Sequence, residues 1–357
     1  MLRPLSLLVA AFLAFATPLV SPAQQPAAKV RAKRGDGVTI LLQRHGLNPV
    51  RDYNRFVALN RAQMGPRNSL IAGKYYRLPA RQAAPAKRKT RATAAAAPAS
   101  ATARATTKVK TPLSNKQLFG PRYGQVAPRS RQLSGTVYYL LSGHGGPDPG
   151  AVGQYGSNQL AEDEYAYDIT TRLARVLMEH GAKVHLIVQD PNDGIRDEAV
   201  LKMDRDEITA PNLTIPLNHV ARLRQYTNAI NRLHGRYKGA YQRMITLHID
   251  SRSAGLNTDV FFYHHDKSPV GKRLANNIHK VFTARYKRSQ PNRPYVGTVS
   301  PRSSLYVVRN SHAPTVFIEL GNIRNDKDQR RFVIPDNRQA LANWICEGLI
   351  TDYRNRK

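Results

Sequence analysis

From Gln132 onward, short apolar runs alternate with longer stretches in which apolar residues recur at helical spacing. The apolar runs predict strands at Thr136–Leu141, Lys183–Val188, Met244–His248, Val260–Tyr263, Tyr306–Val308 and Thr315–Leu320. Helical spacing predicts helices over Leu160–His180, His219–His234, Val270–Tyr286 and Arg338–Tyr353. Strands alternating with helices are typical of an α/β domain. We therefore expect residues 132–357 to form one α/β domain, with a mostly parallel sheet flanked by helices.

Residues 29–80 show a shorter pattern of their own. Apolar residues at helical spacing predict helices over Val38–Gly46 and Tyr53–Ala62, separated by Asn48-Pro49. A turn is expected at Arg34–Gly37, and a glycine turn followed by a strand at Leu70–Pro79. These elements predict a small α+β domain.

Residues 81–131 lack a recurring apolar pattern. Ala, Thr, Pro, Lys and Arg dominate, and the segment contains no Asp or Glu. Such a composition buries too little apolar surface to offset the entropy of ordering the chain. We expect a disordered, basic linker between the two domains.

The beginning of the chain indicates export. Arg3 precedes an apolar run from Leu5 to about Val20, and the small residues Ser21-Pro22-Ala23 follow. This pattern predicts a signal peptide over residues 1–23, because the run is shorter than the roughly 20 residues of a membrane-spanning helix. An uncleaved anchor is the alternative. We expect a protein secreted across the inner membrane, periplasmic or associated with the cell wall.

Charge is distributed unevenly along the chain. Residues 1–147 contain 24 Lys and Arg but only two acids, whereas residues 148–357 contain 31 Lys and Arg and 22 acids. The excess favours polyanionic partners. For an exported chain we expect anionic envelope polymers, bound through the linker, and no nucleic acid. The single cysteine, Cys346, excludes an intrachain disulfide and is expected to be a buried thiol.

Groups capable of chemistry fall at the ends of predicted strands. His144 lies in the glycine-rich loop Ser142–Gly150, which lacks the spacing of phosphate-binding loops. His248 and Glu319 end two further strands, and the acidic run Glu162–Glu164 begins a helix. Sites in α/β sheets form beyond the carboxyl ends of the strands. Two imidazoles, a carboxylate ligand and a spare carboxylate are the layout of a hydrolytic zinc site.

Four segments carry a resemblance to a known family. Gly143–Ala151, Leu160–Glu164, Thr246–Ser251 and Pro314–Gly321 closely resemble, in order, motifs of the zinc-dependent N-acetylmuramoyl-L-alanine amidases of amidase type 3. The resemblance implies zinc ligands at His144, Glu162 and His248, and a catalytic Glu319. Glu162 rather than Glu164 matches the ligand by its register with the following helix. Asp148 also matches the motif, and we expect it to brace the loop or a ligand.

The implied reaction is hydrolysis of the amide between N-acetylmuramic acid and L-alanine of the peptidoglycan stem peptide, in cell-wall remodelling or daughter-cell separation. Alternatives are another zinc-dependent cell-wall peptidase or deacetylase, and a non-catalytic peptidoglycan-binding regulator. Residues 29–80 resemble a LysM module in Gly35-Asp36, Leu59-Asn60 and the segment ending at Leu78-Pro79. That resemblance implies binding to the glycan of peptidoglycan. We expect a monomer.

Two further expectations concern the rest of the large domain. The polar insertion between Asp190 and Leu217 is interpreted as a solvated surface excursion, with a lid near the cleft as the alternative. His264-His265 are expected to have no metal role, because adjacent strand residues face opposite sides. Between His248 and Glu319 we identify one ordinary helix and no inhibitory helix of the kind some similar amidases carry, so we expect activity to be limited by targeting.

Overall fold

The computed structural model describes residues 28–33, 36–47, 49–65, 69–80, 113–252 and 255–356. The predicted signal peptide, Arg34-Gly35 of the predicted turn and residues 81–112 of the predicted linker lie outside these ranges. The chain divides into two compact units between Ala103 and Arg104. Within the described ranges, no helix combines the length and apolar character needed to cross a membrane.

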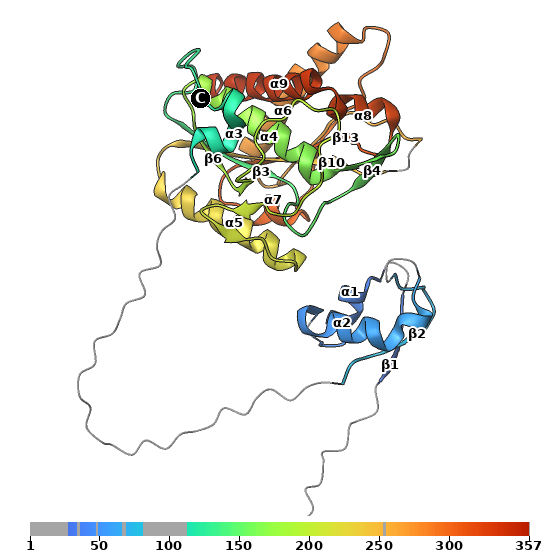
Figure 1. Ribbon diagram of the computed structural model, residues 1–357. Helices are drawn as coiled ribbons and strands as arrows, with labels where there is room; N and C mark the ends of the chain where they lie inside the picture. Colours follow the sequence, from blue (N-terminus) through green and yellow to red (C-terminus); the bar gives the residue numbers. More distant parts are fainter. Residues whose placement is uncertain are drawn as a thin grey trace, which may run out of the picture. The chain divides into compact units, whose positions relative to one another are not determined.

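The N-terminal unit is a two-stranded sheet with two helices. β1 (Lys29–Arg31) pairs antiparallel with β2 (Tyr75–Arg77), and α1 (Val38–Arg44), α2 (Pro49–Asn60) and the 3-10 helix η1 (Arg61–Gln63) lie between them in sequence (Figure 1). The buried side chain of Asn60 holds α2 to β2, donating to the carbonyl of Arg77 at 2.8 Å and accepting from its amide at 2.7 Å. The sequence pattern predicted both helices and the closing strand but not β1, because three residues with one apolar side chain carry no periodic signal.

The larger unit is built on a six-stranded sheet with the order β12-β11-β13-β10-β3-β6. The strands are β3 (Thr136–Ser142), β6 (Lys183–Leu186), β10 (Tyr241–Asp250), β11 (Phe261–His264), β12 (Val299–Pro301) and β13 (Thr315–Asn322). β6, β3, β10 and β13 run parallel, whereas β11 is antiparallel to β13. The sheet is therefore mostly parallel, as the alternation of strands and helices predicts.

Helices cover both faces of this sheet (Figure 1). The helices are α3 (Asn115–Tyr123), α4 (Glu162–Glu179), α5 (His219–Arg236), α6 (Pro269–Ser289), α7 (Tyr306–Asn310), α8 (Asp326–Val333) and α9 (Pro335–Arg354). Along β3, Tyr138 and Leu140 join the core beneath α4, α6 and α9, while the intervening Tyr139 and Leu141 join the core beneath α5 and α7. Both sets are buried because alternate strand residues face opposite sides of a sheet that is covered on each face.

Several elements differ from the sequence-based expectations, and three of the differences are informative. Helix α3 lies within the range predicted as disordered linker, because a capping box of Ser114 and Gln117 begins the helix and the buried Phe119 anchors it to the large core. Residues Tyr306–Val308, predicted as a strand, begin helix α7; a three-residue apolar run does not distinguish a strand from a buried helical turn.

The third difference is the start of helix α4. The sequence predicts it at Leu160, but Asn158–Ala161 forms β5, which pairs antiparallel with β4 (Val152–Tyr155). The helix consequently begins at Glu162. This boundary places the carboxylate of Glu162 on the first residue of the helix, where the hairpin presents it to the sheet edge.

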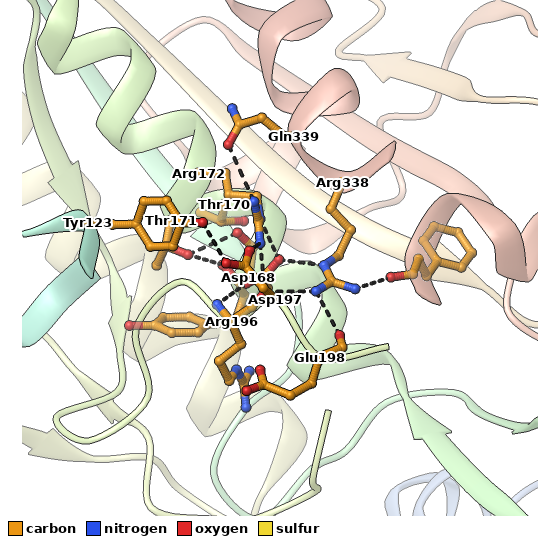
Figure 2. Close-up of polar contacts among 12 residues, drawn as sticks. Tyr123, Asp168, Thr170, Thr171, Arg172, Arg196, Asp197, Glu198, Arg338 and Gln339 are labelled. Atoms are coloured by element: carbon orange, nitrogen blue, oxygen red, sulfur yellow. Dashed lines mark hydrogen bonds and ion pairs between the residues drawn. The ribbon is translucent and has the colours of Figure 1, made fainter. Parts of the chain in front are cut away.

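A buried network of charged side chains fixes one end of the Asp190–Leu217 insertion (Figure 2). Asp168 of α4 accepts hydrogen bonds from Nε of Arg172 at 2.7 Å and from Nε of Arg338 at 2.6 Å, and both arginines are buried. Both guanidinium groups also donate to the carbonyl of Arg196, and the amide of Arg196 donates to Asp168. The start of the insertion is therefore tied to α4 and α9 through groups that satisfy each other's hydrogen bonds.

Candidate active site

The candidate residues meet at the carboxyl end of the parallel sheet. His144 follows β3, His248 lies near the end of β10, and Glu319 lies on β13. His248 and Glu319 are directly paired in the register of β10 with β13. The His144 and His248 rings lie edge to face with centroids 5.1 Å apart. The topology therefore brings together groups that are 104 and 71 residues apart in sequence.

The glycines of the His144 loop allow close approach of backbone and ring. A Cβ at Gly143 would lie 2.2 Å from the His248 ring, and one at Gly150 would lie 2.6 Å from Oε2 of Glu162. His144 itself has a φ of 69°, a left-handed conformation that few non-glycine residues adopt. The Tyr226 hydroxyl of α5 supports this turn by donating to the carbonyl of His144 at 2.7 Å.

Asp148 orients the His144 ring from the other end of the loop. Its Oδ2 atom accepts a hydrogen bond from Nδ1 of His144 at 2.8 Å and also pairs with Arg222 of α5. With the proton held on Nδ1, the Nε2 atom of His144 is free to act as a ligand. This contact agrees with the bracing role expected for Asp148.

Glu162 lies between the two imidazoles. Its Oε2 lies 3.2 Å from Nε2 of His144, and its Oε1 lies 3.0 Å from Nδ1 of His248. The amides of Ala151 and Ile249 donate to the same two oxygens at 2.8 and 3.0 Å. Burial raises the pKa of Glu162, but His144 and His248 outweigh it and hold the pKa below its usual range. The side chain is therefore an ionised acceptor fixed from four directions.

The three side chains fit a tetrahedral zinc ion. Glu162 contacts the His144 and His248 rings through different oxygens, at 3.2 and 3.0 Å. Each of the three side chains also offers one ligand atom that lies within 4.8 Å of the other two, close enough to share one ion. Burial lowers the pKa of His144, yet Glu162 and Asp148 raise it to about 10, so the surroundings of this ring favour a positive charge. Two imidazoles and one carboxylate are a frequent donor set for catalytic zinc. Glu164, the other acid considered from the sequence, lies outside this group.

Glu319 is a carboxylate without a hydrogen-bond partner for its Oε2 atom among the described residues. Burial is the largest cause of a pKa raised well above the usual range, and the charges of Glu162 and Asp250 add to it. A carboxyl with a buried, unpaired oxygen near the sheet edge is suited to exchange a proton with a group bound there.

The Asp190–Leu217 insertion is part of the site's support rather than a solvated excursion. Oε2 of the buried Glu207 accepts a hydrogen bond from the Gly146 amide at 2.7 Å, and Ile215 packs beneath Gly145 and Gly146. The insertion therefore packs against the His144 loop. Sequence reasoning missed Glu207, Ile215 and Arg222 as supporting residues, because the insertion contains several acids and isoleucines and no periodicity that distinguishes these from the others.

His264 and His265 lie apart from the described groups of potential metal ligands. Nδ1 of His264 contacts the carbonyl of His265, and Nδ1 of His265 pairs with Asp266. Neither belongs to a group of potential metal ligands among the described residues. Cys346 is a buried free thiol in α9, as expected.

Comparisons with known proteins identify similar sequences and structures. The family model described as N-acetylmuramoyl-L-alanine amidase matches residues 139–351. A germination-specific N-acetylmuramoyl-L-alanine amidase of Bacillus subtilis is 22% identical over 229 residues, covering 64% of this chain and 84% of the relative. An N-acetylmuramoyl-L-alanine amidase structure from Nostoc punctiforme is 19% identical and covers 62% of this chain and 99% of its own, with a TM-score of 0.44. One from Clostridium difficile is 15% identical, covers 65% and 100%, and has a TM-score of 0.46.

The family match extends from β3, through both histidine positions and Glu319, into the last helix. It includes more than half of the chain and most of the larger unit. The chain therefore belongs to the N-acetylmuramoyl-L-alanine amidase family, hydrolases that act on an amide bond of peptidoglycan.

Proposed function

We propose that the chain is a zinc-dependent amidase that releases stem peptides by cleaving the bond between N-acetylmuramic acid and L-alanine. The observation that carries the zinc assignment is the placement of Glu162 between His144 and His248 at distances that suit one ion. His144, Glu162 and His248 are the proposed ligands. A zinc ion bound there supplies a Lewis acid that polarises the scissile carbonyl and acidifies water.

The protein groups around this centre have separable roles. Glu319 accepts the proton of the attacking water and returns it to the departing amine of L-alanine. Its unpaired Oε2 atom leaves the carboxyl free to make that transfer. Asp148 keeps the proton of His144 on Nδ1, and the Ala151 and Ile249 amides hold Glu162 in one orientation. All four proposed site residues lie on one chain, which supports activity as a monomer.

The N-terminal part of the chain is proposed to deliver this activity to the wall. The β1-α1-α2-β2 order and the buried Asn60 support a LysM-like glycan-binding module. Residues 81–112 contain eight Lys and Arg and no acid, which supports attachment to anionic envelope polymers rather than nucleic acid in an exported protein. Export through the sequence-predicted signal peptide and a periplasmic or wall-associated location complete the proposal. We propose that activity is limited by targeting, and the presence of a single long helix, α6, between His248 and Glu319 among the described residues supports this proposal.

Digestion of purified peptidoglycan tests the function directly. The full chain is incubated with peptidoglycan, with and without a chelator, and the released fragments are identified by mass. We expect free stem peptides with an L-alanine amino terminus, and their loss on chelation followed by recovery when zinc is added. Cleavage within the peptide identifies a peptidase, and loss of acetyl groups identifies a deacetylase. Binding without cleavage identifies a non-catalytic regulator.

A further inference from the structure

A second group of carboxylates lies outside the His144–Glu162–His248 site. It consists of two sets that share Glu207: Asp163, Glu164 and Glu207, and Asp190, Asp204 and Glu207. In each set, one oxygen from every residue lies within 4.8 Å of the others. Asp163, Glu164 and Asp190 are each 1% exposed, and Glu207 is 5% exposed. The sets join the first turn of α4 to the Asp190–Leu217 insertion.

Few positive groups balance these acids. Among the described residues, the ion pairs of the five carboxylates are confined to one contact, in which Arg196 lies 3.0 Å from Glu164. Arg196 also pairs with Asp193, so its charge is shared. Buried carboxylates this close repel one another strongly unless a proton or a cation lies between them.

Two oxygens in the cluster have unused hydrogen-bonding capacity. Oδ2 of Asp163 and Oδ1 of Asp204 are buried and have no hydrogen-bond partner among the described residues. One belongs to each set. The other Asp163 oxygen accepts from the amide of Glu164 at 3.0 Å, so the orphaned atom belongs to a side chain that is itself held in place. Burying a carboxylate oxygen without a hydrogen-bond partner costs folding free energy, so these two oxygens indicate a missing partner.

We propose that this cluster binds a hard divalent cation of the calcium class. The donors are all carboxylate oxygens, which suit calcium and magnesium rather than zinc. Calcium ligands lie about 2.3–2.6 Å from the ion, so oxygens bound to one calcium ion are at most about 5 Å apart, and the oxygens of each set lie close enough together to share one ion. The five carboxylates supply more charge than one divalent ion neutralises, so the ion is bound with part of the set and the remainder is offset by Arg196 and backbone amides.

The cation has a structural role. Glu207 accepts from the Gly146 amide, two residues from His144. The amide of Asp204 donates to Glu164 at 2.9 Å. An ion held by these carboxylates therefore fixes the insertion to α4 and, through Glu207, stabilises the His144 loop. It occupies a place separate from the zinc site and takes no part in the hydrolysis.

Calorimetric titration of the full, zinc-loaded chain with CaCl2 tests this site, because zinc already fills the other candidate centre. We expect one calcium per chain with zinc retained, and a thermal midpoint raised by about 5–10 °C at 100 times the dissociation constant. Asp204→Asn should weaken calcium binding at least tenfold and remove the shift in midpoint. Glu198→Gln neutralises an exposed acid of the same insertion and should bind calcium like the wild type.

Two results overturn the proposal. One is the absence of binding heat and of any midpoint shift for the wild-type chain up to about 10 mM calcium, well above the concentration at which weak extracellular sites fill. That result would mean that shared protons, and not a cation, offset the repulsion between the carboxylates. The other is a calcium affinity in Asp204→Asn equal to that of Glu198→Gln, which places the ion elsewhere. Circular dichroism of each variant establishes that it is folded before either comparison is made.

Discussion

Asp148 and Arg222 form an ion pair that links the His144 loop to helix α5. The Asp148 oxygen that meets Arg222 is also the one that accepts from Nδ1 of His144. Arg222 is buried and in turn donates to the carbonyls of Pro216 and Leu217 at the end of the insertion. The orientation of one proposed ligand therefore depends on an arginine 78 residues away in sequence.

This relationship predicts a defect in metal affinity for Asp148→Asn. An amide is a weaker acceptor than a carboxylate and leaves Arg222 without its counter-charge, so the His144 ring is less firmly held. We expect zinc affinity to fall about 10–100-fold. Competition with a chromophoric chelator measures the change. Asp266→Asn removes an exposed acid beside His265 and serves as the control. Equal zinc affinity in the two variants would contradict a bracing role for Asp148.

A different outcome is expected for Glu319→Gln and Glu319→Ala. Glu319 lies outside the group formed by the proposed ligands, so both variants should keep one zinc per chain. Loss of the proton-transferring carboxyl should lower the rate of stem-peptide release about 10²–10⁴-fold. Zinc content and mass-resolved release are measured on the same preparations. Wild-type release by a zinc-loaded variant would remove Glu319 from the mechanism.

The sequence predicted the groups at strand ends better than the residues that support them. Apolar runs indicate strands, and the carboxyl ends of parallel strands lie at one edge of the sheet. The sequence could therefore predict that His144, His248 and Glu319 lie at that edge. Three consecutive acids begin α4, so Glu162 could be chosen as the ligand only from the register of the family motif. Glu207 and Ile215 could not be predicted, because the irregular insertion has no periodicity that indicates which side chains turn inward. The short helix α7 was missed because three apolar residues fit either structure.

The buried network around Asp168 predicts a large loss of stability for Asp168→Asn. The substitution removes the charge that faces both Arg172 and Arg338, and Arg338 is fully buried. Breaking a buried ion pair from one side costs about 3–5 kcal/mol. We expect a loss of this size in the free energy of unfolding, measured by urea denaturation of the zinc-loaded chain.

A surface pair provides the matched control for that measurement. Glu347 meets Arg285 at 2.6 Å, but both side chains are more than 40% exposed. Solvent screening limits such pairs to about 1 kcal/mol or less. Glu347→Gln should therefore change the urea midpoint only slightly. A similar effect of the two substitutions would show that burial of the Asp168 network does not contribute as argued.

The acidic cluster predicts a pH-dependent stability difference between Glu207→Gln and the wild type in the absence of metals. Burial raises the pKa of Glu207 to about 7, and the charges of Glu164 and Asp190 add to it. Between pH 4.5 and 7 the folded wild type retains a proton on Glu207 that the unfolded chain releases, so its stability falls as pH rises through this window. Glutamine stays neutral and avoids this loss.

Chelated wild type and Glu207→Gln should therefore be about equally stable near pH 4.5, while at pH 8 the variant should be more stable by about 1–3 kcal/mol. Urea unfolding across the pH range measures the difference in the free energy of unfolding. Both proteins are treated with a chelator, so the loss of zinc affects them equally and does not contribute to the difference. Adding calcium to zinc-loaded protein at pH 8 should reverse the order, since only the wild type keeps the full carboxylate set. A difference that does not vary with pH would mean that Glu207 is already ionised in the folded chain near pH 4.5.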